Sequence, residues 1–227
     1  MLQNPLLTLF FPKVCCCCGK HLHAKLQHIC LSCRNSLPKT NFHLQQENPL
    51  QKLFWGRIPF HNVLSYYKFV DSGKIRRLIH HFKYKGMKEI GLTVGNMYGK
   101  ELMAASSLEE VDCIVPVPLH KKKQKIRGYN QSHFFADGLS QSCGIECYKH
   151  AVEKSEHTAS QTKKGRYKRW TNVSSSFQIV QPEKLENKHV LLVDDVLTTG
   201  ATIEACGQKI LAVPGTKITV ATMACTI

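Results

Sequence analysis

The most informative stretch of the sequence is Val190-Leu-Leu-Val-Asp-Asp-Val-Leu-Thr-Thr-Gly-Ala-Thr-Ile203. Its first four residues are apolar and partly β-branched, which predicts a buried strand. The strand delivers two adjacent carboxylates, Asp194 and Asp195, at its carboxyl end, and a Thr- and Gly-rich loop then opens a helix. Because ligands of open α/β sheets bind at this end of the strands, the order predicts a ligand site. An ordinary strand followed by a capped helix would leave the two acids unexplained.

The loop and the two acids suit different parts of one ligand. The backbone N–H groups and hydroxyls of Thr198–Thr202, together with the helix N-terminus, form a cradle for a phosphate. Asp194 and Asp195 would repel a phosphate, but they suit vicinal hydroxyls, with a metal ion as a possible third participant. A ribose 5-phosphate carries a phosphate on one side and a diol on the other. The stretch therefore predicts a ribose-phosphate site.

The rest of the chain alternates between helical and strand patterns. A helix is expected from Asp71 or Ser72 to near Gly86, and a second helix places Ile90, Val94, Met97, Tyr98 and Leu102 on one face. Further buried strands are expected at 111–115 and 218–222. This alternation predicts an α/β fold, in which helices flank a mostly parallel sheet.

Two cysteine pairs, Cys15-x2-Cys18 and Cys30-x2-Cys33, are separated by eleven residues. Each pair sets two thiolates on a tight turn, so four sulfurs can surround one ion. A closed shell of four sulfurs is typical of structural zinc and leaves no open position for catalysis. Cys16 and Cys17 leave the choice of ligands in the first pair ambiguous, although the spacing favours Cys15 and Cys18. The alternative is a set of reduced thiols without a metal.

At 227 residues the chain can hold one full domain and a small appendage. Residues 39–49 are polar and typical of a linker. We expect a zinc-ribbon domain over residues 1–45 and an α/β domain over residues 50–227. No apolar run is long enough to span a bilayer, and the first twelve residues lack the charged start of a signal peptide. These features predict a cytoplasmic protein without membrane insertion.

The formal net charge of +15 is concentrated in two clusters, at 121–127 and 163–169, each with five basic residues and no acid. Such clusters favour polyanionic partners, either phosphorylated small molecules or nucleic acid. Tyr129, Tyr167 and Trp170 lie beside them, and aromatic rings between basic residues are typical of single-stranded DNA binding. The alternative is a solvated basic surface without a partner.

The stretch 190–202 resembles the thirteen-residue phosphoribosyl-pyrophosphate motif of type I phosphoribosyltransferases. Other segments, in the same order along the chain, extend the resemblance to the ComF family. They are the two Cys-x2-Cys pairs, Lys83-Tyr-Lys-Gly86, Asp112-Cys-Ile-Val-Pro-Val-Pro118, Arg127-Gly-Tyr-Asn-Gln131, and Ser160-Gln-Thr162 followed by Arg166, Arg169, Asn172 and Phe177. The resemblance spans most of the chain and implies a type I phosphoribosyltransferase fold with an N-terminal zinc ribbon.

The resemblance also implies roles for individual residues. Asp194 and Asp195 would hold the ribose hydroxyls, and Thr198, Thr199, Gly200, Ala201 and Thr202 would hold the 5-phosphate. Pyrophosphate would be bound by the loop after the strand at 111–115 and by a basic residue beyond it: Pro116, Val117, Pro118, Leu119, His120 and Arg127. Residues 161–177 take the place of the catalytic hood, or form a basic surface loop. Thr198 stands where purine phosphoribosyltransferases carry an acidic base, so a purine acceptor would lose its proton acceptor.

Two functions remain open at this stage. The first is a magnesium-dependent phosphoribosyltransferase that acts on an unknown acceptor and has a role in competence and DNA uptake. The second is a non-catalytic protein that senses phosphoribosyl pyrophosphate and binds single-stranded DNA, with a competence helicase or DNA-processing protein as a partner. A weaker third reading is a zinc-ribbon nucleic-acid module with an empty pocket. The sequence leaves the oligomeric state open.

Overall fold

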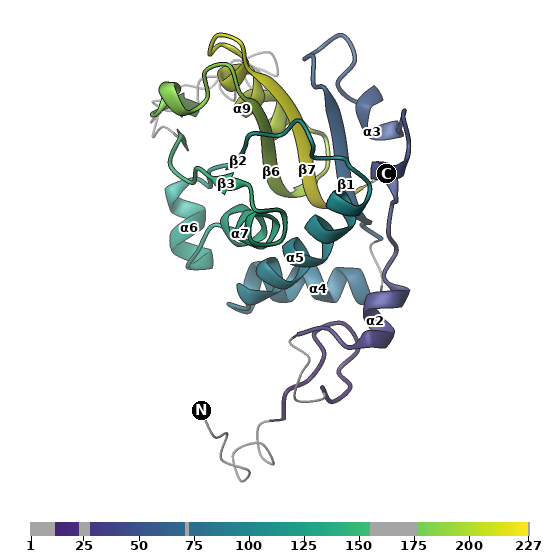
Figure 1. The fold of residues 1–227 in the computed structure, drawn as a ribbon. Coiled ribbons are helices and arrows are strands. Elements are labelled where there is room, and N and C mark those ends of the chain that lie inside the picture. Colours follow the sequence, from purple (N-terminus) through teal and green to yellow (C-terminus); the bar gives the residue numbers. More distant parts are fainter. Residues whose placement is uncertain (1–11, 23–27, 71–72, 155–176, 227) are drawn as a thin grey trace, which may run out of the picture.

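The computed structural model describes residues 12–22, 28–70, 73–154 and 177–226. Five parallel strands form its central sheet in the order β1-β7-β6-β2-β3 (Figure 1). The strands are β1 (Asn62–Lys68), β2 (Cys113–Pro116), β3 (Glu146–Cys147), β6 (His189–Leu197) and β7 (Lys217–Cys225). The predicted strands at 111–115, 190–193 and 218–222 correspond to β2, β6 and β7. The predicted parallel sheet is therefore confirmed, and β6 lies at its centre.

Successive side chains of β6 enter two different hydrophobic clusters, as the two-residue period of a strand requires. Val190 and Leu192 pack in one cluster with residues of α9 (Ala201–Leu211), whereas Leu191 and Val193 pack in the other. The second cluster includes residues of α4 (Gly73–Tyr84), α5 (Glu89–Ala104) and α7 (Gln131–Cys143). Figure 1 shows these three helices together, on the side of the sheet away from α9. Burial on both faces explains the unbroken apolar run before Asp194.

The two helical faces expected from the sequence are present. On α4, the predicted apolar residues Ile75, Leu78, Ile79 and Phe82 are all buried. On α5, Ile90, Val94, Tyr98 and Leu102 are buried, and Met97 is half-buried. The expected capping residues of the first helix, Asp71 and Ser72, lie outside the described residues.

Close packing of α5 against α7 positions one wall of the candidate site. Gly95 and Gly138 face each other across the two helices. A Cβ atom on Gly95 would collide with the carbonyl oxygen of Phe135, and one on Gly138 with that of Leu92. The glycines therefore allow the two backbones to approach closely. The first turn of α7, which carries Gln131 and Ser132, is held beside β6 as a result.

Smaller elements surround this core. β4 (Val152–Lys154) and β5 (Phe177–Ile179) form a two-stranded antiparallel sheet. The short helices are α2 (Leu31–Ser36), η1 (Phe42–Leu44), α3 (Pro49–Lys52), α6 (Lys121–Arg127) and η2 (Pro182–Lys184). None of the helices in the described ranges is long and apolar enough to cross a membrane.

Residues 39–49, expected to form a linker, instead pack along the outer edge of β1. The backbone N–H of Thr40 donates to the carbonyl of Tyr66 over 2.9 Å, and the Asn48 side chain donates to the carbonyl of Val63 over 3.1 Å. Thr40, Phe42 and Asn48 are all buried. These contacts satisfy backbone groups that an edge strand would otherwise expose. The prediction of a linker from polar composition is therefore wrong for this segment.

Candidate ligand site and metal centre

Asp194 is held at the centre of the sheet by hydrogen bonds to its carboxylate. Its Oδ1 accepts from the hydroxyl of Ser132 and from the backbone N–H of Asp195, each over 2.8 Å. Burial, and then the charge of Asp195, raise the pKa of Asp194 to about 6. The sequence predicts that the strand ends before this pair. In the structure β6 continues to Leu197, so both acids lie within the last four residues of the strand.

Asp195 faces two cationic side chains. The Lys83 Nζ atom lies 3.0 Å from Oδ2 of Asp195, and the Arg127 Nη1 atom lies 3.9 Å from the same oxygen. Arg127 also donates to Oε1 of Gln131 over 2.9 Å. All three charged side chains are mostly buried. The end of α4, the end of α6 and strand β6 therefore converge on one carboxylate.

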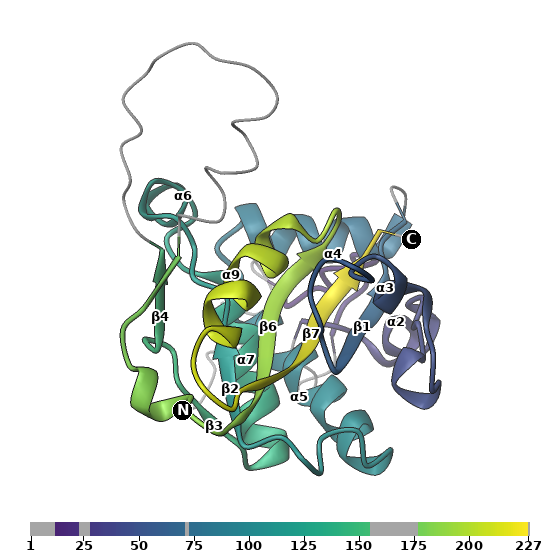
Figure 2. The same cartoon turned by 90° about the horizontal axis from the view of Figure 1, so that it is seen from above.

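The loop after β6 turns at a glycine and leads directly into a helix. Gly200 adopts a left-handed backbone, with φ of +78°, and α9 begins at the next residue. A Cβ atom on Gly200 would lie 2.6 Å from the ring of Phe54, so close packing requires glycine as well. Figure 2 shows α9 turning back along β6 from the carboxyl end of that strand. A small hollow of about 40 Å³ is lined by Asp194 and by residues 196–203.

A larger cavity of about 350 Å³ joins this hollow to the loop after β2. The two hollows share Asp194, Val196 and Thr202. Most of the predicted site residues line one or both of them: Val117, Pro118, Leu119, His120, Arg127, Asp194, Asp195, Thr198, Thr199, Gly200, Ala201 and Thr202. Pro116 is buried as the last residue of β2 and directly precedes this loop. The structure thus brings together the three segments that the sequence separates.

Several lining residues had no predicted role. They are Lys83, Asn130, Gln131, Ser132 and Lys154, whereas Lys123 belongs to the basic cluster 121–127 that was expected to favour polyanionic partners. Burial lowers the pKa of Lys154, and the nearby charge of Lys123 lowers it further. Asn130 caps α7 by accepting from the N–H of Ser132, and its amide donates to the carbonyl of Val117 over 3.0 Å. The segments 83–86 and 127–131 carried the resemblance, and this was the signal that could have identified Lys83 and Gln131.

Residues expected to form the hood, 161–176, and the basic cluster 163–169 lie outside the described residues, as do Tyr167 and Trp170. The described flanks of this segment are β4 and β5. Phe177, the last residue of the expected hood, is buried in β5, where the Lys154 Nζ atom lies 4.7 Å from the centre of its ring.

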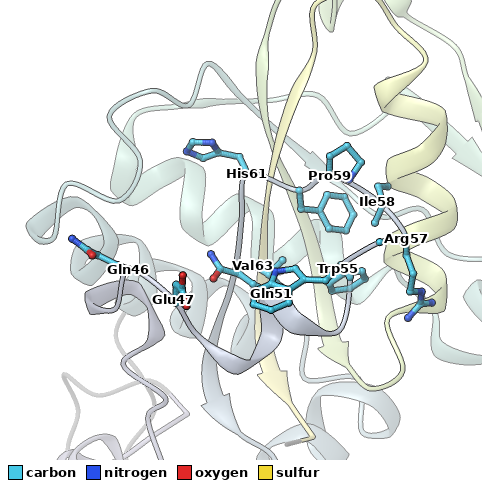
Figure 3. Close-up of a pocket in the computed structure, with 12 residues that line it drawn as sticks. Gln46, Glu47, Gln51, Trp55, Arg57, Ile58, Pro59, His61 and Val63 are labelled. Atoms are coloured by element: carbon cyan, nitrogen blue, oxygen red, sulfur yellow. The ribbon is translucent and has the colours of Figure 1, made fainter.

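Two other hollows are larger, but none of the predicted site residues lines them. One, of about 570 Å³, lies between residues 46–63 at the outer edge of β1. Figure 3 shows Gln46 and Glu47 on one side of it, and Ile58, Pro59 and Arg57 on the other. The second, of about 630 Å³, lies between α5 and residues that include Arg34 and Tyr66. Volume alone therefore does not locate the site; the converging carboxylates and cations do.

The four predicted cysteine ligands form one cluster. The Sγ atoms of Cys15, Cys18, Cys30 and Cys33 all lie within 4.8 Å of one another. Gly19 makes the first turn possible with φ of +77°, and its N–H donates to the carbonyl of Cys15 over 2.8 Å. Cys16 and Cys17 are buried but lie outside this group of four, which removes the ambiguity left by the sequence. Four sulfurs so arranged suggest a structural metal such as zinc.

Comparison with known proteins finds a matching domain family and several relatives. Residues 147–225 match the phosphoribosyl transferase domain family. The chain is 27% identical over 201 residues to the DNA utilization protein YhgH of Escherichia coli, covering 87% of this chain and 84% of that protein. It is 26% identical over 204 residues to competence protein F of Haemophilus influenzae, covering 86% and 89%. Competence protein ComFC of Bacillus subtilis is 27% identical over 150 residues, which are 65% of this chain and 57% of that protein.

The parallel sheet, the acidic pair at the end of β6 and the Thr-Gly loop before α9 define a protein of the type I phosphoribosyltransferase fold. A four-cysteine cluster, consistent with a zinc ribbon, precedes that fold. The similarity to competence protein F, ComFC and YhgH, together with the phosphoribosyl transferase match, supports the ComF family.

Proposed function

We propose that the 350 Å³ cavity binds phosphoribosyl pyrophosphate. The observation that carries the proposal is the meeting of three segments at one cavity: the acidic pair of β6, the loop before α9 and the loop after β2. Asp194 and Asp195 would accept hydrogen bonds from the ribose hydroxyls, and residues 198–202 would hold the 5-phosphate. Val117–His120 and Arg127 would face the pyrophosphate.

The charge of the cavity supports an anionic ligand. Four basic side chains line it, Lys83, Lys123, Arg127 and Lys154, against the two acids Asp194 and Asp195. The positive excess lies in a partly enclosed space, where charges interact more strongly than in bulk water. An anionic ligand would relieve the repulsion among these cations, and a neutral ligand would not.

We further propose that the bound ligand transfers its phosphoribosyl group to an acceptor of unknown identity. The bond between C1 and the pyrophosphate oxygen would break with its electron pair leaving on pyrophosphate, and the acceptor would bond to C1. The basic side chains would stabilise the departing charge. Thr198 is exposed and offers a hydroxyl rather than a carboxylate. A purine acceptor would therefore lack a carboxylate at this position to accept its proton.

Magnesium fits this site only together with the ligand. Among the described residues, no His or third acid joins Asp194 and Asp195 in a cluster that could hold an ion. Magnesium in proteins commonly uses one or two carboxylates together with substrate phosphates and water, and the acidic pair meets that need. The ion would neutralise charge on the pyrophosphate.

We assign zinc to Cys15, Cys18, Cys30 and Cys33, within a zinc-ribbon module of residues 1–45 that precedes a phosphoribosyltransferase domain of residues 50–227. The Sγ cluster supports zinc because a closed four-sulfur set suits a structural ion. Such an ion would organise residues that are too few to form a hydrophobic core alone.

The names of the relatives, which mention DNA utilization and competence, support a role in DNA uptake. One observation favours a second candidate, a non-catalytic protein that senses phosphoribosyl pyrophosphate and binds single-stranded DNA. Helix α6 carries four lysines and an arginine, and all of its residues except the partly buried Arg127 are exposed. A competence helicase or another DNA-processing protein would then be the partner.

Calorimetric titration with phosphoribosyl pyrophosphate, with and without magnesium, tests the binding. We expect saturable heat at one site per chain. A pyrophosphate-release assay with candidate acceptors then separates the two functions: acceptor-dependent release supports transfer, and binding without release supports sensing. The absence of heat under both conditions would contradict the proposal.

A further inference from the structure

The end of α4 is built into the wall of the cavity. Three successive residues of this helix contact the cavity region, each in a different way. The Phe82 carbonyl accepts a hydrogen bond from the Tyr129 hydroxyl, Lys83 pairs with Asp195 over 3.0 Å, and the Tyr84 ring lies 5.8 Å from the Arg127 guanidinium. The backbone on either side of Lys83 is thus fixed to the segment 127–131, which directs the Lys83 side chain into the cavity.

Lys83 and Arg127 share a single anionic oxygen. Both nitrogens lie within 4 Å of Oδ2 of Asp195, so the two cations are at most about 7 Å apart. At this separation, and with both side chains mostly buried, their mutual repulsion is considerable. One carboxylate balances only one of the two charges. Asp194 supplies a second negative charge, but Lys123 and Lys154 also line the cavity. Four basic side chains therefore face two acids, and positive charge is left over.

We infer that Lys83 contacts the pyrophosphate group of the bound ligand and that it discriminates phosphoribosyl pyrophosphate from ribose 5-phosphate. The inference rests on the proposed function and adds to it a residue and a specificity. In the free protein Asp195 holds the Lys83 ammonium in the cavity that Arg127 and the loop 117–120 also line. A pyrophosphate oxygen then supplies the second anion that the two cations need, and Asp195 accepts from the ribose hydroxyls.

The alternative is that Lys83 serves only to neutralise Asp195. The two roles predict different losses when the charge is removed. A counter-ion of Asp195 affects the ribose end, which both ligands share, so its loss would change both affinities alike. A contact to pyrophosphate affects only the ligand that carries this group. Comparison of the two ligands therefore separates the roles.

The experiment is calorimetry on the full, zinc-loaded chain with phosphoribosyl pyrophosphate and with ribose 5-phosphate, using the wild type, Lys83→Met and Lys83→Arg. Lys85→Met is the matched control, because Lys85 is exposed two residues further along and has the same charge. For Lys83→Met we expect affinity for phosphoribosyl pyrophosphate to fall about tenfold or more, with less than about a threefold change for ribose 5-phosphate. Lys83→Arg should retain most of the affinity, and Lys85→Met all of it. Lys83→Gln replaces Lys83→Met if the latter fails to fold.

Each outcome decides between the roles. Wild-type affinity in Lys83→Met, or equal losses for the two ligands, overturns the inference while leaving the proposed function intact. If the wild type binds neither ligand, the proposed function itself fails and the inference fails with it. A selective loss that Lys83→Arg restores establishes the contact.

Discussion

The Ser132 hydroxyl donates a 2.8 Å hydrogen bond to Oδ1 of Asp194 and so joins the first turn of α7 to the central strand β6. This bond favours the ionised carboxylate, whereas burial and the charge of Asp195 oppose it and raise the pKa of Asp194 to about 6. Burial and the charge of Asp195 outweigh the hydrogen bond. The protein therefore maintains at neutral pH a carboxylate that destabilises its fold, which is expected of a group retained for binding.

The first prediction is that Asp194→Asn stabilises the fold, and more so at pH 7.5 than at pH 5. The folded pKa is raised above the unfolded value, so the ionised acid destabilises fully above about pH 6, and the effect disappears toward pH 4. Asparagine still accepts from Ser132 but carries no charge. Thermal or urea unfolding should show that the free energy of unfolding increases by on the order of 1–3 kcal/mol at pH 7.5. A gain that does not change with pH, or one that Glu183→Gln at an exposed position reproduces, would contradict this reading.

The second prediction concerns the loop before α9. Gly200→Ala should destabilise the protein more than Gly128→Ala, because both glycines have φ near +80° but only Gly200 lies against a side chain, the Phe54 ring. The left-handed strain common to both costs about 1–2 kcal/mol, and the clash adds to it at Gly200. Urea unfolding of each variant, alone and with Phe54→Leu, measures the two parts. Phe54→Leu should reduce the penalty only at Gly200; equal penalties at the two glycines would refute the packing argument.

The third prediction concerns the metal. Cys16 and Cys17, between two proposed ligands, are buried together with Tyr67, Phe82 and other residues of the main core. Removal of zinc should therefore lower the melting temperature of the whole α/β fold, not only of the cysteine segment. Metal analysis of protein purified without added zinc should give about one ion per chain, and Cys33→Ser should lose both the ion and the stability. A metal-free protein of unchanged melting temperature would show that the cysteines are bystanders.

The fourth prediction concerns nucleic acid. Lys121, Lys122 and Lys125 are exposed on α6, and their joint change to Ala leaves Lys123, which lines the cavity, in place. We expect the wild type to bind single-stranded DNA weakly. In this variant the slope of log K against log salt concentration should be shallower by up to about 2. Fluorescence anisotropy across a salt series is the measurement, with Lys52, Lys184 and Lys217 changed to Ala as the charge-matched control. If binding changes neither with salt concentration nor in either triple variant, electrostatic binding of DNA through α6 is excluded.

The sequence predicted the centre of the site well because strand, acids and loop are contiguous between Val190 and Ile203. The conformational preferences involved are local, because β-branched residues favour the strand and glycine favours the turn at Gly200. The spacing of the cysteine pairs predicted the Sγ cluster for the same reason. Local patterns also predicted α4 and α5, whose apolar faces are helical in period.

The rest of the site depends on distant parts of the chain that local patterns do not relate. Lys83 reaches Asp195 because α4 packs on α5 and Tyr129 holds the end of α4, and Ser132 reaches Asp194 because Gly95 and Gly138 let α5 and α7 approach. The polar composition of residues 39–49 predicts a solvated linker. Asn48 and Thr40 in fact use those groups to satisfy carbonyls of β1.

The most direct test of the central claim is the affinity for phosphoribosyl pyrophosphate of the double variant Asp194→Asn/Asp195→Asn, measured by calorimetry at pH 7.5 beside the wild type. The control is Glu183→Gln/Glu186→Gln, which removes the same charge at exposed positions ahead of β6. Each charge-assisted hydrogen bond contributes about 1.5–3 kcal/mol, so the account predicts a loss of about tenfold or more in the aspartate variant, with its fold intact and the control unchanged. Wild-type affinity in the aspartate variant would place the ligand elsewhere and contradict the account.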